Sequence, residues 1–514
     1  MKMSEKVGID RPTSSHDPRF GIPKRGIRAL SSLSNYFFGL RGVKLQIAVG
    51  LLAGMDFLLF GYDQGVTGGL LTLDSFRSQF PSIDPLQDGI SSTESGNRST
   101  YQGITVASYN VGCFLGAMLK TIFLGTSIMV IGVILQASAY SIAQFIIGRI
   151  ITGIGNGLNT STVPTWQSEC SRSHRRGQLV MIEGALITGG VMIAYWLDFG
   201  FYFLDPNPVA WRFPLAFQIS FCIIILAFVM SLPESPRWLV LKGRDDQAMH
   251  VLAALNDRPV DSEYVHNEYT AIKDTVLEMQ KGSFRDLFTL GPDRHFHRTV
   301  LAYVNQMFQQ ISGINLITYY IPNVLENQVG LSPTLAKLIA ACNGTKYFLA
   351  SWIAIFAVEK LGRRQLMLLG AAGMSLSMTV FLFVFNTFFA IGWLGMTWLY
   401  PAEIVPLRIR APANALSTSG NWLFNFMVVM ITPVAFDSIG YKTYVIFAVI
   451  NAFIFPVVYF FYPETAYRSL EEMDNIFMKT KSIFTTVKQA RDEPRRFDKN
   501  GELLIKYEET EEHK

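Results

Sequence analysis

Residues 167–177 of this chain read QSECSRSHRRG, and residues 401–411 read PAEIVPLRIRA. In each stretch a glutamate precedes an arginine by seven residues. The four residues are Glu169, Arg176, Glu403 and Arg410. Each stretch lies at the end of the fourth apolar run of its half of the chain, and each half then closes with Pro-Glu-Ser or Pro-Glu-Thr. Matched features in the same order predict two halves built alike.

The chain around these stretches is strongly apolar. Half of its residues are hydrophobic and 16% are charged, whereas soluble domains average roughly 25% charged residues. Twelve apolar runs between residues 46 and 462 approach or exceed the ~20 residues that a helix needs to cross a bilayer. The sequence therefore predicts an all-α polytopic membrane protein with two six-helix bundles around a central cavity, where parallel-repeat transporters bind their substrate.

The domains are predicted as an N-terminal tail (1–44), a bundle of spans 1–6 (45–232), a helical linker (233–298), a bundle of spans 7–12 (299–463) and a C-terminal tail (464–514).

The distribution of Lys and Arg residues gives the expected orientation of these domains in the membrane. The N-terminal tail holds nine Lys and Arg residues, while the segments 70–101, 201–210 and 323–334 hold two. The positive-inside rule then places both tails and the linker in the cytoplasm. The net charge of +4 reflects this sidedness and predicts a lipid bilayer, not a nucleic acid, as partner.

Two charged residues stand inside predicted spans. Asp63 lies near the outer end of span one, in LFGYDQGVTGG, and Arg149 lies in span four. An ionisable residue within a span is costly unless it is paired, so we expect these two to satisfy each other. Gly153 and Gly157 follow the arginine at a spacing that lets another helix approach closely. Protonation of Asp63 would break the pair and could couple a proton gradient to a conformational change. The alternative is that Asp63 anchors a helix end in the headgroup layer.

Eight motifs in order resemble the sugar porter family of the major facilitator superfamily, over roughly residues 45–480. They are GYDQGVTGG (61–69), GRIITGIGNG (148–157), the Glu169–Gly177 loop, PESPRW (233–238), QQISGINLITYY (309–320), EKLGRR (359–364), PAEIVPLRIR (401–410) and PET (463–465). The chain is most similar to fungal sugar porters, in the part of the family that also holds polyol and glycerol symporters. The resemblance implies sugar/proton symport by alternating access, with a sugar or polyol as the small-molecule partner.

The resemblance also implies functional residues. Family sugar-contacting positions correspond to Gln309, Gln310, Asn315, Trp398, Asn421, Trp422 and Asn425. The cytoplasmic charge network that joins the halves when the outer gate is open corresponds to Glu169, Arg176, Glu359, Arg363, Arg364, Glu403 and Arg410. Amides both donate and accept, which suits a hydroxyl-rich ligand. The alternatives are that the amides only bond neighbouring helices and that the charges are only topology signals.

Two positions depart from the common hexose-porter pattern. In span five, Glu183 and Gly184 stand where many members have a sugar-contacting Gln, and in span eight Tyr347 replaces an amide. These changes could suit a disaccharide, a polyol or another sugar. Glu183 could be a second titrating group, or it could pack or face a loop.

Each half also lacks a piece of the family pattern. The stretch GAMLKTIFLG (116–125) has no acidic residue and no Gly-Arg-Arg between spans two and three. The apolar stretch 102–143 must nevertheless cross twice, since otherwise the basic loop at 172–176 would be exported. Residues 365–402 likewise leave no turn between two crossings of ~20 residues. We hypothesise two internal deletions, near residues 119–120 and 380–381, which truncate two helix hairpins.

The absence of several catalytic and metal-binding motifs excludes some classes of function. No HExxH motif, Cys/His cluster or nucleophile–base constellation is present, so we expect no metal, no catalytic residues and no cofactor other than the coupling proton. Asn97 begins a glycosylation sequon in an expected outside loop. The chain is expected to be a monomer in the plasma membrane. Alternatives to sugar/proton symport are a polyol or glycerol symporter, a passive facilitator, and a non-transporting nutrient sensor on the same fold.

Overall fold

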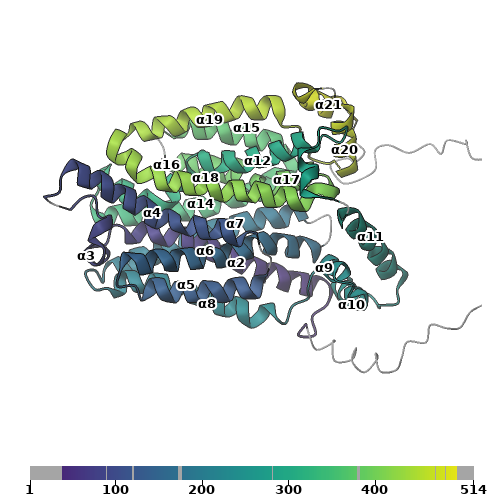
Figure 1. The fold of residues 1–514 in the computed structure, drawn as a ribbon, viewed down its shortest axis with the longest axis horizontal. Helices are drawn as coiled ribbons and strands as arrows, with labels where there is room; N and C mark the ends of the chain where they lie inside the picture. Colours follow the sequence, from purple (N-terminus) through teal and green to yellow (C-terminus); the bar gives the residue numbers. More distant parts are fainter. Residues whose placement is uncertain are drawn as a thin grey trace, which may run out of the picture.

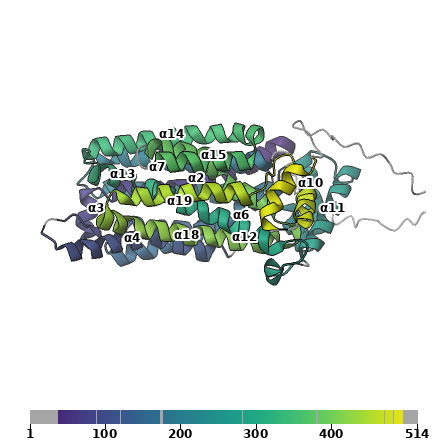
Figure 2. The same ribbon diagram turned by 90° about the horizontal axis from the view of Figure 1, so that it is seen from above.

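The protein is an elongated bundle of long helices (Figures 1 and 2). The computed structural model describes residues 37–87, 89–118, 121–171, 176–280, 282–378, 382–468, 470–480 and 482–494. Within these residues no β-strand occurs. By length and apolarity, seven of the described helical segments could cross a membrane: 42–70, 178–202, 209–229, 333–361, 382–404, 407–439 and 442–461. The helices of the other predicted spans run alongside them in the same bundle.

The first half forms one group of helices. They are α2 (Gly42–Leu70), α4 (Ser92–Gly116), α5 (Ile122–Ala137), α6 (Ile142–Glu169), α7 (Arg176–Tyr202) and α8 (Val209–Val229), with the short α3 (Asp74–Gln79) at one end. Glycines set the closest packing: a Cβ added to Gly153 would lie 2.1 Å from the Tyr109 carbonyl oxygen on α4, and one added to Gly157 would lie 2.3 Å from that of Cys113. The predicted small-residue contact of α6 is therefore confirmed, with α4 as its partner.

The second half forms the other group. It contains α12 (His295–Ile311), α13 (Ile314–Asn327), α14 (Pro333–Leu361), α15 (Arg363–Ser377), α16 (Leu382–Phe389), η4 (Ala390–Leu394), α17 (Met396–Ile404), α18 (Arg410–Ile439) and α19 (Lys442–Phe461). The predicted continuous seventh span is wrong in one respect, because α12 and α13 are separated at Gly313. Its φ of 97° favours glycine, and it ends the helical hydrogen-bond ladder there. The second half also begins at His295, earlier than the predicted residue 299.

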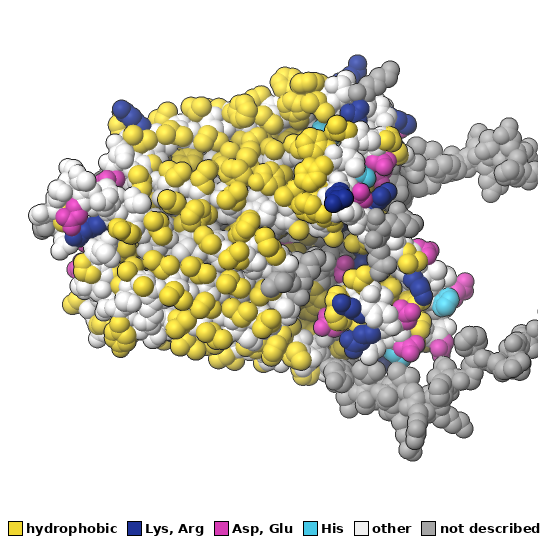
Figure 3. Space-filling view, in the orientation of Figure 1, with side chains coloured by type: hydrophobic (Ala, Val, Ile, Leu, Met, Phe, Trp, Pro, Cys, Tyr) yellow, Lys and Arg dark blue, Asp and Glu magenta, His cyan; other side chains and the backbone are white. Residues whose placement is uncertain are grey.

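Both the linker and the tail gather at one end of the bundle, which we call the linker end. The linker holds α9 (Pro236–Leu241), α10 (Asp245–Asn256), α11 (Glu263–Gln280) and η3 (Phe284–Phe288), and the tail holds α20 (Leu470–Lys479) and α21 (Thr486–Asp492). The opposite end, where α3 lies, is the far end. Figure 3 shows hydrophobic side chains over the flank of the bundle and charged ones mostly toward its two ends.

The hairpin α4–α5 stops short of the linker end. The antiparallel crossing predicted for residues 102–143 is confirmed, because Gly125 near the start of α5 packs on Asn159 of α6 and Gly132 packs on Thr152. From Asn159, α6 continues ten residues to Glu169, which is about 15 Å of helix. The predicted deletion point, 119–120, lies outside the described residues, but the helices on either side of it have the expected truncated form.

The hairpin α15–α16 stops short of the far end. Lys346 Nζ of α14 donates to the Phe383 carbonyl oxygen at 2.6 Å, near the start of α16. From there α14 extends thirteen residues further, to Pro333, or about 20 Å. The turn at 379–381 lies outside the described residues. The two hairpins are thus truncated at opposite ends of the molecule.

Candidate functional site

The predicted charged pair forms at the centre of the first half. Arg149 Nη1 of α6 lies 3.4 Å from Asp63 Oδ2 of α2, and both side chains are fully buried. Arg149 also donates to the Val106 carbonyl oxygen at 3.2 Å and lies over the ring of Tyr109. Asp63 Oδ1 has no hydrogen-bond partner. Asp63 is therefore not an anchor at a helix end; it lies inside α2, with its charge balanced by a single arginine.

The predicted amides meet next to the break between α12 and α13. Asn421 Nδ2 of α18 donates to Gln309 Oε1 at 2.9 Å and to Gln306 Oε1 at 2.6 Å. Gln310 Nε2 also donates to Gln309 Oε1, at 2.9 Å, and Asn315 donates to Gln310. The break thus places amides from both sides of it in one hydrogen-bonded group, which we call the amide cluster: Gln306, Gln309, Gln310, Asn315 and Asn421.

Two other predicted contact residues lie on the same helix as Asn421. Trp422 and Asn425 are buried, and Trp422 Nε1 and Asn425 Oδ1 have no hydrogen-bond partner. The ring of Trp422 lies 5.5 Å from that of Phe60 on α2, across the boundary between the halves. A buried polar atom without a partner is costly, so these two atoms are suited to a polar ligand.

Sequence reasoning missed Gln306. It stands three residues before Gln309, on the same face of α12, and its Nε2 donates to the Thr397 carbonyl oxygen at 3.0 Å. The spacing alone could have identified it. Gln306 and the predicted Trp398 both line the large cavity of the protein.

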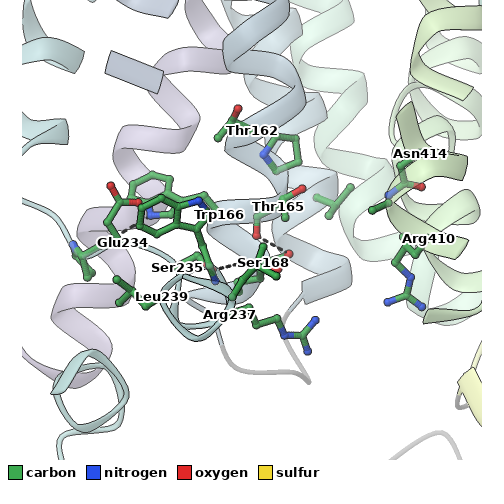
Figure 4. Close-up of a pocket in the computed structure, with 18 of the residues that line it drawn as sticks. Thr162, Thr165, Trp166, Ser168, Glu234, Ser235, Arg237, Leu239, Arg410 and Asn414 are labelled. Carbon is green, nitrogen blue, oxygen red and sulfur yellow. Dashed lines mark hydrogen bonds between the residues drawn. The ribbon is translucent and has the colours of Figure 1, made fainter. Parts of the chain in front are cut away.

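That cavity, of about 1860 Å³, lies at the linker end between the two halves. Figure 4 shows its opposite walls, with Trp166 and Ser168 on one side and Arg410 and Asn414 on the other. Residues of the truncated hairpin, including Ala117 and Phe123, also line it. The cavity therefore occupies part of the space beside the shortened α4 and α5.

The predicted charge network divides between these walls. In the second half, Arg363 binds Glu403 with its Nη2 at 2.8 Å and its Nε at 3.1 Å, and it lies 3.8 Å from Glu359. Arg364 donates to the Tyr459 carbonyl oxygen at 2.7 Å. In this half Glu359, Arg363 and Glu403 therefore form one group, while Arg410 donates to the Val405 carbonyl oxygen at 3.1 Å.

The first-half charges have different partners. Glu169 accepts a hydrogen bond from Ser235 of the PES motif, while the side chain of Arg176 lies outside the described residues. Sequence reasoning used the matching PET motif only as a boundary signal and missed Glu464. This carboxylate accepts from the backbone N–H groups of Arg363 and Arg364 at 2.9 and 3.1 Å, and so caps the N-terminus of α15.

The far end is closed by bonds between the halves. Tyr195 Oη donates to the Thr318 carbonyl oxygen at 2.6 Å, and Trp196 Nε1 donates to Thr345 Oγ1 at 2.9 Å. A Cβ added to Gly68 would lie 2.6 Å from the Tyr319 carbonyl oxygen. The structure is therefore open at the linker end and closed at the far end.

A buried ion pair adds to this closure. Lys337 Nζ of α14, 2% exposed, lies 3.5 Å from Glu326 and 4.5 Å from the ring centroid of Tyr202 on α7. Asp198 of α7 is also buried and interacts electrostatically with Lys337. Lys337 is thus the cation shared by carboxylates of both halves.

Lys337→Met is expected to open the far end. Removing the cation leaves the buried Asp198 and the half-buried Glu326 without it, at a cost of about 3–5 kcal/mol in the closed state. The measurement is modification of Asn343→Cys, in a chain with Cys342→Ser, by an impermeant thiol reagent added at the far end. We expect modification to accelerate about 10-fold or more, because 1.4 kcal/mol is already tenfold.

The matched control is Lys346→Met on the same helix, since Lys346 bonds within its own half. Equal protection of the cysteine in the Lys337 and Lys346 variants would contradict the role of Lys337.

The glycosylation sequon lies at the far end. Asn97 is exposed but stands in the first turns of α4, so the expected loop position is wrong. The helix begins before the apolar run, at Ser92, because the Ser91 side chain accepts a hydrogen bond from the Glu94 N–H and so caps the N-terminus of α4.

Comparison with known proteins identifies the family. The family model of sugar (and other) transporters matches residues 49–382 and 375–477. Sugar transporter STL1 of Saccharomyces cerevisiae is 39% identical over 477 residues, covering 86% of this chain and 83% of that protein. MFS-type transporter oryC of Aspergillus oryzae is 39% identical over 488 residues, covering 88% of each.

These alignments bear on the truncated hairpins. The alignment with STL1 has 477 positions, but it includes only 86% of the 514 residues of this chain, which is about 442 residues. About 35 positions of the alignment therefore have no counterpart in this chain. With oryC, 488 positions cover 88%, about 452, which leaves about 36. The two family-model matches also meet at residues 375–382, around the turn of the second short hairpin.

Solved structures share the fold. The MFS proton:xylose symporter XylE bound to 6-bromo-6-deoxy-D-glucose has a TM-score of 0.72 at 24% identity, over 84% of this chain and 99% of that one. The inward open conformation of XylE from E. coli has a TM-score of 0.67 at 25% identity, with the same coverages. This chain therefore has the major-facilitator fold and belongs to the sugar (and other) transporter family of membrane proteins.

Proposed function

We propose that the chain is a secondary active transporter that moves a sugar or a related polyol together with a proton by alternating access. The observation that carries this proposal is the buried Asp63–Arg149 pair. A buried carboxylate–arginine pair is a group whose protonation changes the charge inside the protein. Protonation would release Arg149 and favour a different packing of α2 against α6.

The proposed orientation places the linker end in the cytoplasm, with both termini there and the far end outside the cell. The basic segments of the sequence support it. In this orientation the structure is the inward-open state, and the tight far-end contacts are the closed outer gate. The plasma membrane is the proposed location of the active protein.

The proposed substrate site is the amide cluster together with Trp398, Trp422 and Asn425. Amides and indole N–H groups offer donors and acceptors to sugar hydroxyls, and the aromatic faces can cover the apolar face of a ring. The site lies at the break in the seventh span, as in transporters that bind substrate at discontinuous helices. No chemical conversion of the substrate is proposed.

The test is uptake of labelled glucose, xylose, lactose and glycerol by cells that lack their own carriers and express this chain, with and without a protonophore. Uptake that the protonophore abolishes supports symport and identifies the substrate class. If the protonophore leaves uptake unchanged, the result would contradict symport and indicate passive facilitation. Surface expression without uptake of any of the four would favour a nutrient sensor.

Gln309→Ala is expected to raise the half-saturation concentration by about 10- to 100-fold, because losing a buried hydrogen-bonded group costs about 1–3 kcal/mol. Gln309 accepts from two other amides, so its loss also frees their orientation. Concentration-dependent uptake measures this effect.

Asn323→Ala is the control for Gln309→Ala, since the Asn323 side chain accepts a hydrogen bond from Asn327 on the same helix. An unchanged half-saturation concentration in Gln309→Ala would remove the amide cluster from the substrate site.

A further inference from the structure

A second buried carboxylate lies on α2. Asp56 is seven residues before Asp63, which places it on the same helix face about 10 Å nearer the linker end. It is 2% exposed. Asn159 Nδ2 of α6 donates to Asp56 Oδ1 at 2.6 Å and contacts Thr126 Oγ1 at 3.0 Å. The other carboxylate oxygen, Oδ2, is buried and has no hydrogen-bond partner.

Glu183 of α7 lies near this carboxylate. It is 3% exposed and interacts electrostatically with Asp56. Helices α2 and α7 pack closely here, since a Cβ added to Gly54 would lie 2.5 Å from Leu186 Cδ1. Gly54 is two residues from Asp56 and Leu186 is three residues from Glu183, so the two carboxyl residues lie at similar heights along the bundle. Of the alternatives for Glu183, a position facing a loop is wrong, because the residue is buried within α7.

The surroundings of this carboxyl pair contain no balancing cation among the described residues. Asn159 and Thr126 are neutral, and the Cys222 thiol of α8 is the other titratable group that interacts with Asp56. Arg149 is engaged with Asp63, further along α2. Two carboxylates buried near each other without a cation cannot both be ionised, and a buried unpaired carboxylate costs several kcal/mol.

The pair also lies near the large cavity. The cavity at the linker end is lined by Val180 of α7, three residues from Glu183, and by Thr160 of α6, next to Asn159. The carboxyl pair is therefore located between Asp63 and the inner end of the cavity.

We propose that Asp56 and Glu183 hold one proton between them and form a second proton-binding site, which exchanges that proton with the cavity. The step is a proton transfer only: one carboxyl O–H bond breaks as another O–H bond forms on water or on the second carboxylate. Its place in transport rests on the proposed proton symport, with this site on the cytoplasmic side of Asp63. Binding of the proton does not depend on that symport.

Infrared difference spectroscopy of the purified full chain in lipid, titrated with pH, tests the binding. A protonated carboxyl has a C=O stretch that shifts in D₂O. We expect such a band to persist in Asp63→Asn, to change frequency in Asp56→Asn and in Glu183→Gln, and to disappear in the double variant Asp56→Asn/Glu183→Gln. The control is Asp474→Asn, because Asp474 binds Arg298 at 2.7 Å near the tail. An unchanged band in a folded double variant would overturn the proposal.

Transport gives a second readout. Glu183→Gln is expected to slow proton-driven uptake by about 100-fold, the low end of what a positioned acid–base group contributes, while exchange of labelled for unlabelled substrate without a proton gradient continues. Equal proton-driven rates in Glu183→Gln and in the unaltered chain would show that the pair binds a proton outside the transport route. If Asp63→Asn still couples, the proposed coupling role of Asp63 fails, and the infrared band still decides the binding site.

Discussion

Asp63→Asn is expected to abolish concentrative uptake, so that the accumulation ratio of the labelled substrate falls to one. Asparagine has the shape of aspartate but cannot bind a proton. Arg149 then stays buried with the Val106 carbonyl oxygen and the Tyr109 ring as its contacts. The proton gradient no longer changes the charge of the pair and so cannot bias the equilibrium between the two conformations.

The measurement compares accumulation at an imposed pH gradient with equilibrium exchange of the same substrate. Exchange should continue in Asp63→Asn, because both sides then carry substrate and no net proton movement is needed. Asp63→Glu, which keeps the carboxyl group, is the matched control and should retain coupling. Full accumulation by the asparagine variant would assign the coupling to another group.

Restoring the two hairpins is expected to raise the amount of folded protein at the cell surface, and uptake with it, by about fivefold or more, since 1–2 kcal/mol already changes abundance several-fold. The short α4–α5 hairpin ends about 15 Å before the end of the neighbouring α6. The short α15–α16 hairpin ends about 20 Å before the N-terminus of the neighbouring α14.

The experiment inserts the corresponding segments of STL1 at 119–120 and 380–381, separately and together. Inserts of equal length made of Gly and Ser are the control, because they lengthen the chain without restoring apolar helix. If these flexible inserts raise surface expression as much as the STL1 segments do, the hairpins are not the cause. Sequencing the transcript across codons 119–120 and 380–381 shows separately whether the short form is the one the cell makes.

The central ion pair could be predicted because charges are rare inside apolar runs. Arg149 and Asp63 were conspicuous as an opposite pair on two spans, and the structure places them together. Asp56 lies in the same apolar run, but nothing in the sequence indicates that Glu183, more than a hundred residues away, would lie near it. Such a pair depends on the rotation of two helices about their axes, which hydropathy does not determine.

Most of the amide cluster could be predicted for a similar reason, but one of its residues and the helix break beside it were missed. Gln309 and Asn421 stood out as amides within spans. Gln306 was overlooked, although its spacing from Gln309 places it on the same helix face. The break at Gly313 was also missed, because a glycine inside an apolar run is equally compatible with a continuous helix. Only the positive φ in the structure separates the two cases.

The short helices have a consequence for the surrounding lipid. At 1.5 Å per residue, the 16 residues of α5 span about 24 Å and the 15 of α15 about 22 Å, less than the ~30 Å of a typical hydrocarbon core. In a bilayer, each short hairpin is expected to thin the adjacent lipid or to let polar groups enter, and the two hairpins are truncated at opposite ends of the molecule. Hydrophobic mismatch of this kind costs fractions of a kcal/mol per Å, so the two short helices are expected to be less costly in a thin bilayer than in a thick one.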